Sequence, residues 1–559
     1  MIKTSLQNLK TVVNNMILGI HDGHDSGAAI VDKEKIFAVN EERLNREKYY
    51  RGFPKNSTKK VLELSNSSPE DIDKIAVAGI YRKRKRLLKL EKELEKILGP
   101  IDDKIVNVEH HLAHASSAYF TSGWNKGTVL TIDAAGDGIS SAIYLGTNNN
   151  LNKIAQSTYL NSLGDFYASI TEMIGFQPMK HEGKIMALGA YHNSDNYYDF
   201  SNCITLNGLT FNNKMNVTGS KSAKKISKKI DFPIHRKKEI ANLLRKNKLN
   251  HKLSIKAIKA ASSAQKHLEK LLRDLSNNIL ENDEINEKFK QKIAYSGGLA
   301  QNVKGNSIIR KKFDESYIFP HMGDGGLSLG AALYLHNNYN GSGNYEMKNS
   351  VKNVYLGPKY SNHEVREVLE DYDKLRFRKS NNIINEVGNL ISEGNIVSLF
   401  QGKMEYGPRA LGNRSILSDP SDVSLKDRLN NSLGREPFQP FAPTILDSRV
   451  DDYLKDPGEN KFMTMSFEVE DSTKEDLKAT IHVDGTTRPQ IISEEDNYRF
   501  YNIIKEFEEL SGIGAVLNTS FNMHGEPIVC SPRDAAKSFL RSDLDYLVIE
   551  DFLAEKKKK

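Results

Sequence analysis

TVLTIDAAGDG, residues 128–138, is the stretch that decides the fold we expect. A β-rich run leads into Asp133 and then into Gly136 and Gly138, which predicts a buried strand ending in a loop with room for a bound group. The same arrangement recurs in MILGIHDGHDSGAAIV (16–31) and KIAYSGGLAQN (292–302). Backbone N–H groups in such loops can approach an anion. Three of these loops, with acidic residues inside them, predict an α/β fold whose cleft grips a nucleotide between two lobes.

The spacing of apolar residues predicts the remaining elements. Helices are expected at 84–98, 164–175 and 255–281. Strands are expected at 16–20, 27–31, 74–80, 128–136, 141–146 and 292–298. At NNYNGSGNYEMKNS (337–350) the periodicity gives way to Asn, Gly and Ser, which indicates a linker. We therefore expect two domains, 1–352 and 353–559, of which the second is also α/β.

The composition excludes several classes of protein. The 559 residues include only two cysteines, so no disulfide framework is expected and a reducing cytoplasm is the default. No run approaches the ~20 apolar residues of a membrane helix. Apolar residues make up 38% of the chain and charged residues 27%, as in globular rather than disordered proteins. We expect a cytoplasmic protein with no membrane contact.

The segment NVEHHLAHASSAYF (107–120) places three histidines within five positions. On a helix, His110 and His114 are four residues apart and share a face, whereas His111 points elsewhere. A divalent metal needs further ligands, and Asp133 and Asp324 both stand beside glycines where strands or loops end. The alternatives are a plain helix and two aspartates satisfied by turn amides. Our prediction is a metal site formed by these two histidines and two aspartates.

The glycine loops also supply candidates for nucleotide binding. These candidates are Gly136, Asp137, Gly297, Gly298 and Asn302. Lys184, in the segment HEGK, is a further candidate for contacts to phosphate. The alternative for Lys184 is an ion pair with Glu182.

Nine motifs together resemble the O-carbamoyltransferases of antibiotic and nodulation-factor biosynthesis. They run in order from residue 17 to about 551, nearly the whole chain. The most specific are GPRALGNRS (407–415) and LNTSFN (517–522). They accompany HDSGAAIV, the pair His110/His114, TIDAAGDG, HEGKIMALGAY, YSGGLAQN, GDGG and REPFQPFAP.

The resemblance implies a fold and a reaction. The N-terminal domain would be of the actin/sugar-kinase (ASKHA) type, and the C-terminal domain would be similar to threonylcarbamoyl-adenylate synthases. The C-terminal domain would join carbamoyl phosphate and ATP into carbamoyl adenylate, and the N-terminal domain would transfer the carbamoyl group to an acceptor hydroxyl. The family's metal ligands fall on the same four residues as above, and the implied ion is Fe²⁺, with Mg²⁺ accompanying ATP.

Both substrates are anionic, so their activation calls for cations and planar donors. Arg409, Arg414 and Arg435 are the candidate cations, and Arg409 and Arg414 are also candidate catalytic residues. The neutral donors expected beside them are Ser415, Asn518, Thr519 and Ser520. The alternative is that these arginines form surface salt bridges.

The chain departs from its relatives at two positions of this presumed pocket. Relatives usually carry Lys where Leu433 stands and Arg where Gln439 stands, so both differences remove positive charge and put the donor in question. His24 matches the family's candidate for the base that deprotonates the acceptor, and an ordinary histidine pKa suits that role. Asp25 would orient His24 or hold a water molecule. The alternative is a histidine satisfied by a neighbouring carbonyl group.

The acceptor cannot be read from the motifs, but the charge distribution bears on it. Residues 221–259 hold fourteen Lys and Arg against two acidic residues, within an expected insertion at 219–260. Such runs are often solvated surfaces, yet this one suits a polyanionic acceptor. Our hypothesis is a hydroxyl carried on nucleic acid, such as a hydroxymethylated base in DNA, ahead of anionic glycans. A sugar or secondary-metabolite hydroxyl is the alternative.

Three other functions compete with carbamoyl transfer. A kinase of the actin-like superfamily would explain residues 17–335 and would release ADP rather than AMP and pyrophosphate. A threonylcarbamoyl-type tRNA enzyme would require threonine and bicarbonate. A nucleic-acid-binding module without activity would bind and not turn over nucleotide. A dimer is compatible with all of these.

Overall fold

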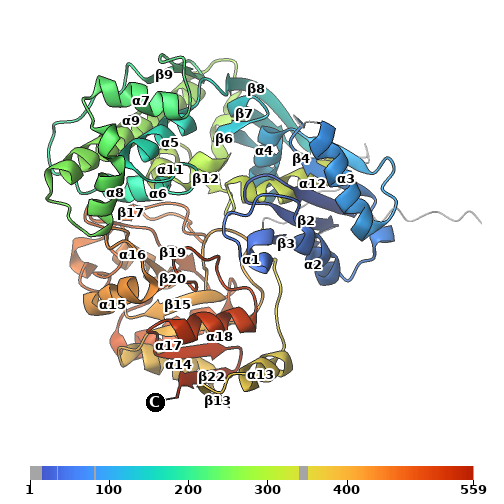
Figure 1. Ribbon diagram of the computed structural model, residues 1–559, viewed down its shortest axis with the longest axis vertical. Coiled ribbons are helices and arrows are strands. Elements are labelled where there is room, and N and C mark those ends of the chain that lie inside the picture. Colours follow the sequence, from blue (N-terminus) through green and yellow to red (C-terminus); the bar gives the residue numbers. More distant parts are fainter. Residues whose placement is uncertain (1–15, 34, 81–83, 339–350, 558–559) are drawn as a thin grey trace, which may run out of the picture.

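The computed structural model describes residues 16–33, 35–80, 84–338 and 351–557. The chain is a mixed α/β protein with three large sheets, two in its N-terminal part and one in its C-terminal part (Figure 1). From residue 339 on, the predicted linker lies outside the described residues. The boundary at 352 therefore stays a prediction.

The first sheet has the order β3-β2-β1-β4-β5. β1, β2 and β3 are antiparallel neighbours, whereas β4 and β5 continue parallel to β1. Helices α2 and α3 cover one face through Val61, Leu62, Leu90 and Leu94, and α12 covers the other. The bounds are β1 Ile17–His21, β2 Gly27–Asp32, β3 Lys35–Asn40, β4 Lys74–Ala78, β5 Ile105–Val108, α2 Lys55–Ser65, α3 Arg84–Leu98 and α12 Leu327–Asn338.

The second sheet repeats this topology with the order β12-β11-β6-β7-β8. Again three antiparallel strands come first in the chain, and two parallel strands follow on the other side. The bounds are β6 Lys126–Gly136, β7 Ile139–Thr147, β8 Asn150–Thr158, β11 Lys292–Ser296 and β12 Glu315–Ile318. The sequence shows no internal repeat, so this duplication is visible only in the structure.

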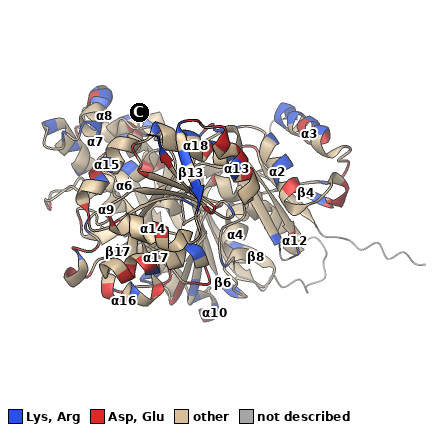
Figure 2. Ribbon diagram, turned by 90° about the horizontal axis from the view of Figure 1, so that it is seen from below, with Lys and Arg blue, Asp and Glu red and all other residues tan. Residues whose placement is uncertain are grey.

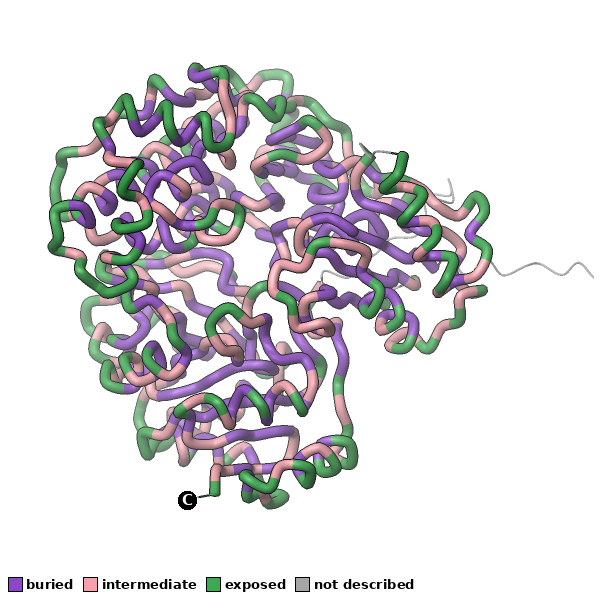
Figure 3. Tube along the Cα trace, in the orientation of Figure 1, coloured by how far each residue is buried: buried purple, intermediate pink, exposed green. Residues whose placement is uncertain are grey.

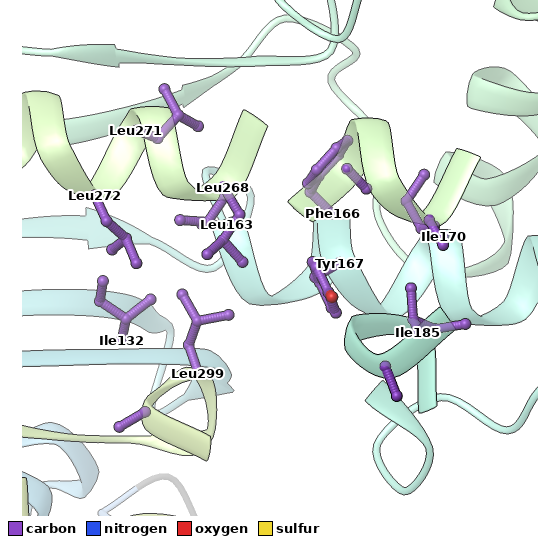
Figure 4. Packing of buried hydrophobic residues seen from close by; sticks show 14 of the residues in the cluster. Ile132, Leu163, Phe166, Tyr167, Ile170, Ile185, Leu268, Leu271, Leu272 and Leu299 are labelled. Carbon is purple, nitrogen blue, oxygen red and sulfur yellow. The ribbon is translucent and has the colours of Figure 1, made fainter. Parts of the chain in front are cut away.

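The core of the second lobe lies between its sheet and helices α5 (Leu163–Ile174) and α9 (Lys252–Glu281). Figure 4 shows Leu268 and Leu272 of α9 among Leu163 of α5 and Ile132 of β6. All four side chains are fully or almost fully buried. Helix α9 therefore holds the lobe together along its whole length.

The C-terminal sheet has the order β13-β22-β21-β14-β15-β20-β16-β19. Helices α14 and α17 pack on one face, and α13, α15 and α18 pack on the other. The strands are β13 Leu375–Lys379, β14 Val397–Phe400, β15 Arg414–Ser418, β16 Ala442–Leu446, β19 Gln490–Ile492, β20 Ala515–Ser520, β21 Tyr546–Ile549 and β22 Phe552–Lys556. The helices are α13 Asn362–Glu370, α14 Ile383–Ser392, α15 Val423–Leu433, α17 Tyr498–Ser511 and α18 Pro532–Arg541.

The shorter elements connect these layers. The helices are α1 Glu41–Asn45, α4 His110–Thr121, α6 Glu182–Gly189, α7 Ser220–Lys229, α8 Lys237–Arg245, α10 Glu287–Lys290, α11 Val303–Arg310 and α16 Val450–Tyr453. The strands are β9 Ile204–Asn207, β10 Thr210–Asn213, β17 Phe467–Glu468 and β18 Thr486–Thr487.

The predicted strands and helices are confirmed, with ends shifted by a few residues at most, and helix 84–98 has the predicted bounds. The basic segment forms α7, α8 and the start of α9. It is not a loose surface run, because Ile226, Ile240 and Leu244 anchor it in the core while its charged residues face outward. Figure 3 shows this pattern of buried interior and exposed outer turns. No helix within 16–33, 35–80, 84–338 and 351–557 is long and apolar enough to cross a membrane.

Candidate functional site

Two histidines and two aspartates meet where α4, β6 and the turn before α12 converge. His110 and His114 lie one turn apart at the start of α4, Asp133 lies in β6, and Asp324 precedes α12. Both Nε2 atoms lie 3.2 Å from Oδ2 of Asp133, and they lie 3.6 and 3.5 Å from Oδ1 of Asp324. All four ligand atoms fall within 4.8 Å of one another. Two imidazoles and two carboxylates converging in this way fit a divalent transition metal.

The electrostatics of the cluster agree with this geometry. Burial alone would lower the pKa of His110, but Asp324 and Asp133 outweigh it and raise that pKa to about 9. The two histidines likewise hold the pKa of the buried Asp133 well below its usual range. His111 points elsewhere, as predicted, and its ring nitrogens bond Thr131 Oγ1 at 2.8 Å and the Ile139 carbonyl at 3.1 Å. The structure thus separates two candidate ligands from one packing histidine.

Glycines are required around the cluster for reasons of space. A Cβ atom at Gly136 would lie 2.0 Å from the His110 ring, and one at Gly298 would lie 2.7 Å from Asp133 Oδ1. Gly297 has φ +102°, and a Cβ there would lie 2.3 Å from the Ile132 carbonyl oxygen. Gly136 and Gly297 therefore allow close packing, and neither lines the cavity described below, so their role as nucleotide contacts stays a prediction.

The other nucleotide candidates divide in the same way. Gly298 and Asn302 line the cavity. Asp137 instead accepts N–H groups from His110 and Ile80, both at 2.9 Å, so it supports the start of α4. Lys184 is bonded to Glu436, not to Glu182 as in the predicted alternative, and both side chains of this pair are buried. This pair joins α6 to the C-terminal part of the chain and leaves Lys184 outside the cavity lining.

A cavity of about 480 Å³ lies between the N-terminal and C-terminal parts. Asp133 and Asp324 reach it from one side, together with His24. Arg409, Arg435 and Arg488 reach it from the other side. Asp133 and Asp324 of the candidate metal site thus share one cavity with the arginines, although more than 80 residues separate the two groups in the sequence.

The three arginines have no carboxylate ion-pair partner among the described residues. Burial lowers the pKa of Arg409 to about 10, and burial with repulsion from Arg409 lowers that of Arg435 to about 10. Burial, Arg409 and Arg435 hold the pKa of Arg488 well below its usual range. Nε of Arg409 and one terminal nitrogen of Arg488 are buried without a hydrogen-bond partner. Mutually repelling, unpaired guanidinium groups indicate an anion-binding site.

Sequence reasoning missed Arg488. It follows β18 in the segment TTRPQ, where no glycine loop marks it, so only the fold brings it beside the other two arginines. Arg435 is held in place by the Thr519 hydroxyl at 2.9 Å and by the Phe441 ring at 4.2 Å. Ser520, one of the predicted donors, lines the cavity.

Three predicted donors lie outside the lining of the cavity, so their role as carbamoyl phosphate contacts stays a prediction. Arg414 is fully buried, and its guanidinium donates to the carbonyl groups of Gln401 and Asn413 at 2.7 and 2.8 Å. Ser415 Oγ accepts the N–H of Gly412. Asn518 donates to Thr444 Oγ1 and the Ala410 carbonyl oxygen. All three form hydrogen bonds with the loop that carries Arg409.

Leu433 and Gln439, the two positions at which the family resemblance implied a loss of charge, lie in different surroundings. Leu433 is 3% exposed and belongs to the apolar core of α15, so it lies outside the cavity. Gln439 lines the cavity. Of these two positions, only Gln439 lies where its side chain could contact a donor.

His24 and Asp25 form a pair at the cavity wall. His24 Nδ1 lies 2.8 Å from Asp25 Oδ2, and this hydrogen bond is the main cause that raises the pKa of His24. Asp25 has φ 55°, an uncommon backbone conformation for a non-glycine residue. Nε2 of His24 is buried and has no hydrogen-bond partner among the described residues, and the ring stacks on that of Tyr49, with 5.9 Å between the ring centres. This geometry leaves one imidazole nitrogen free for a ligand.

Comparison with known proteins places this architecture. Residues 16–99 and 81–333 match the carbamoyltransferase N-terminus, and residues 388–556 match the carbamoyltransferase C-terminus. The chain belongs to the carbamoyltransferase family. It is therefore an enzyme of the transferase class, as predicted.

Two similar proteins cover nearly the whole of this carbamoyltransferase, and a solved structure matches part of it. MJ1051 of Methanocaldococcus jannaschii is 38% identical and covers 97% of this chain and 100% of its own length. Nodulation protein NolNO of Sinorhizobium fredii is 29% identical and covers 96% of this chain and 79% of its own. HypF of T. kodakarensis matches 59% of this chain and 49% of its own at 12% identity, with a TM-score of 0.33.

Proposed function

We propose that this carbamoyltransferase uses ATP and carbamoyl phosphate to carbamoylate an acceptor hydroxyl. The overall reaction takes one water molecule and releases phosphate, pyrophosphate and AMP, and carbamoyl adenylate connects its two halves. The observation that carries the proposal is the shared cavity. Three unpaired arginines stand opposite the two aspartates of a metal cluster, so an anionic donor and an ATP-derived group have facing sites.

Each arginine has a separate task in this proposal. Arg409 and Arg488 carry buried nitrogens without partners, and these would donate to phosphate oxygens in charge-assisted hydrogen bonds. Arg435 is already oriented by Thr519 and Phe441, so it would act as a fixed cation. Placing them in a buried site strengthens their effect on charge that develops during activation.

The metal cluster supports the transfer half. His110, His114, Asp133 and Asp324 would hold the ion, for which Fe²⁺ is our proposal, and Mg²⁺ would accompany ATP. When bound, such an ion polarises phosphate or carbonyl oxygens. Gly298 and Asn302 would contact the nucleotide beside it. His24, oriented by Asp25, would take the acceptor's proton on its free Nε2.

We extend the proposal to the domain types. Two consecutive sheets of the same topology support an N-terminal domain of the actin/sugar-kinase type, residues 1–352, with the nucleotide between its lobes. Residues 353–559 would be the adenylate-forming domain, similar to threonylcarbamoyl-adenylate synthases. The arginine cluster belongs entirely to this second part.

The acceptor is the finest part of the proposal. The outward lysines of α7 to α9 support a polyanionic acceptor, with a hydroxymethylated base in DNA ahead of anionic glycans. Such a base would have to be flipped out of the duplex to reach His24. A sugar or secondary-metabolite hydroxyl is the alternative.

Product analysis tests the reaction. The protein is incubated with ATP, carbamoyl phosphate and candidate acceptors, and nucleotides are separated by ion exchange. We expect AMP and pyrophosphate, and an acceptor heavier by one carbamoyl group in mass spectrometry. ADP in place of AMP would identify a kinase. Activity that requires threonine and bicarbonate would identify a threonylcarbamoyl-transfer enzyme.

A further inference from the structure

A second concave surface lies on the lobe that carries the basic segment. Its volume is about 730 Å³, and it is formed by the segment before β9, by α7 and by α9. Three lysines, Lys214, Lys229 and Lys259, line it together with Tyr197 and Tyr198. We call this surface the lysine groove. None of its residues belongs to the cavity of the proposed active site.

The lysines of the groove are not neutralised by the protein. Among the described residues, Lys214, Lys229 and Lys259 form no ion pair with a carboxylate. Lys229 donates to the Asn202 carbonyl oxygen at 2.5 Å and Lys259 to Asn196 Oδ1 at 2.8 Å, so both ammonium groups are positioned by neutral acceptors. The one acidic lining residue, Asp199, already accepts two hydrogen bonds from Ser201.

The surroundings extend this positive charge. Helix α7 carries Lys221, Lys224, Lys225, Lys228 and Lys229, all exposed, within one 10-residue helix. Residues 221–259 as a whole contain fourteen cationic side chains against Asp231 and Glu239. Figure 2 shows Lys and Arg gathered on α7 and α8. The groove therefore opens within a field that attracts an extended polyanion.

The tyrosines indicate how the partner is recognised. The Lys259 ammonium lies 4.3 Å from the centre of the Tyr198 ring, and Lys266 lies 3.5 Å from that of Tyr197. These lysines occupy ring faces on which unpaired bases or sugar rings would stack. We therefore expect the groove to bind its partner through charge rather than through stacking, and this favours a partner with closely and regularly spaced charges. Duplex DNA carries one phosphate charge per ~1.7 Å of its axis.

We propose that the lysine groove binds the phosphate backbone of duplex DNA, without base stacking and independently of ATP. That the bound DNA also carries the acceptor hydroxyl rests on the proposed function; binding itself does not. If about four phosphates are neutralised, affinity falls with the ~3.6 power of salt concentration. A fourfold rise in salt then weakens binding about 150-fold.

The test is fluorescence anisotropy of a fluorescein-labelled 20-base-pair duplex at 50 and 200 mM salt. The variant Lys214→Glu/Lys229→Glu/Lys259→Glu should lose binding at 50 mM. Its matched control, Lys374→Glu/Lys379→Glu/Lys537→Glu, changes the net charge equally on exposed positions of the C-terminal part and should bind as the wild type does. The single change Lys229→Glu should lower the salt exponent by about one.

Three outcomes overturn the proposal. The wild type does not bind the DNA duplex at 50 mM salt, both triple variants lose binding equally, or the wild type binds labelled heparin, used as a second polyanion, but not the duplex. Pyrophosphate release from ATP with carbamoyl phosphate is measured on the same proteins and should be equal in all of them. Binding without pyrophosphate release in the wild type would refute the proposed function and leave the groove assigned. Pyrophosphate release without DNA binding would refute the groove assignment and leave the proposed function standing.

Discussion

Arg409→Ala and Arg414→Ala should affect different properties of the enzyme, although both arginines belong to GPRALGNRS. Arg414→Ala should lower its stability, and Arg409→Ala should lower its turnover. The Arg414 guanidinium makes two short bonds to the Gln401 and Asn413 carbonyl oxygens and lies 3.6 Å from the Phe400 ring centre. Hydrogen bonds to charged groups contribute about 1.5–3 kcal/mol each, so its loss should cost about 4 kcal/mol of unfolding free energy. For a domain of this size that is a fall in Tm of about 12 °C.

Arg409 makes none of these hydrogen bonds among the described residues, although Nε is buried without a partner in both arginines. Removing its charge also relieves repulsion with Arg435 and Arg488, so stability should change by less than about 1 kcal/mol. One lost charge-assisted contact to the donor should weaken turnover about 10- to 150-fold.

Differential scanning calorimetry and pyrophosphate release, measured on both variants, separate the two effects. Metal content serves as the control for the N-terminal part and should be unchanged. Arg409→Ala with a Tm far below wild type, or Arg414→Ala that is stable but inactive, would refute this division of roles.

Three further outcomes are expected. His114→Ala should lose the bound metal in elemental analysis of the purified protein, because it removes one of four converging ligands, and equal content in wild type and variant would remove the metal assignment. Gln439→Arg should lower the KM for carbamoyl phosphate, and an unchanged KM would place Gln439 outside the donor site. Leu433→Lys should instead lower the free energy of unfolding by several kcal/mol in chemical denaturation, because it buries a charge in the apolar core beside α15. Burial and nearby Lys184 lower the pKa of His181 to about 4, so the folded state favours the neutral imidazole and the protein loses stability as pH falls from about 6.5 to 4. His181→Gln should therefore show a smaller fall in Tm than the wild type across that range. Parallel curves of Tm against pH for the two proteins would contradict this.

The sequence predicted the local elements of the fold well because their signals are local. Helix α3 shows buried Leu90, Leu94 and Leu98 at helical spacing, and its predicted bounds match. The duplicated sheets were not predictable in this way, because topology depends on which strands pair across long stretches of chain. Strand β8 is a further example: its residues are mostly exposed and polar, so no apolar alternation marked it.

The candidate site shows the same limit. The sequence predicted the four candidate metal ligands, which the structure brings together, because two lie at i and i+4 and two stand beside glycines. Arg488 was missed because nothing in TTRPQ distinguishes it from a surface arginine. Only its position in the fold, beside Arg409 and Arg435 at the cavity, does so. Conversely, Lys184 looked like a phosphate contact until the fold brought Glu436 beside it.

The GPRALGNRS loop contains both residues that hold its conformation and a residue that reaches the cavity. Glu405 is 1% exposed, and its Oε1 accepts the N–H groups of Leu411, Asn413 and Arg414 at 2.7–3.0 Å. Its charge and that of Arg414 are thus both used to fold the loop. Arg43 then donates to the Gly407 carbonyl oxygen at 2.6 Å, which ties the loop to the N-terminal part. Nε is buried without a partner in both Arg409 and Arg414 among the described residues, but only Arg409 lines the cavity, whereas the Arg414 guanidinium donates to backbone carbonyl groups. Chemistry is therefore assigned to Arg409 by its position and by the absence of these hydrogen bonds.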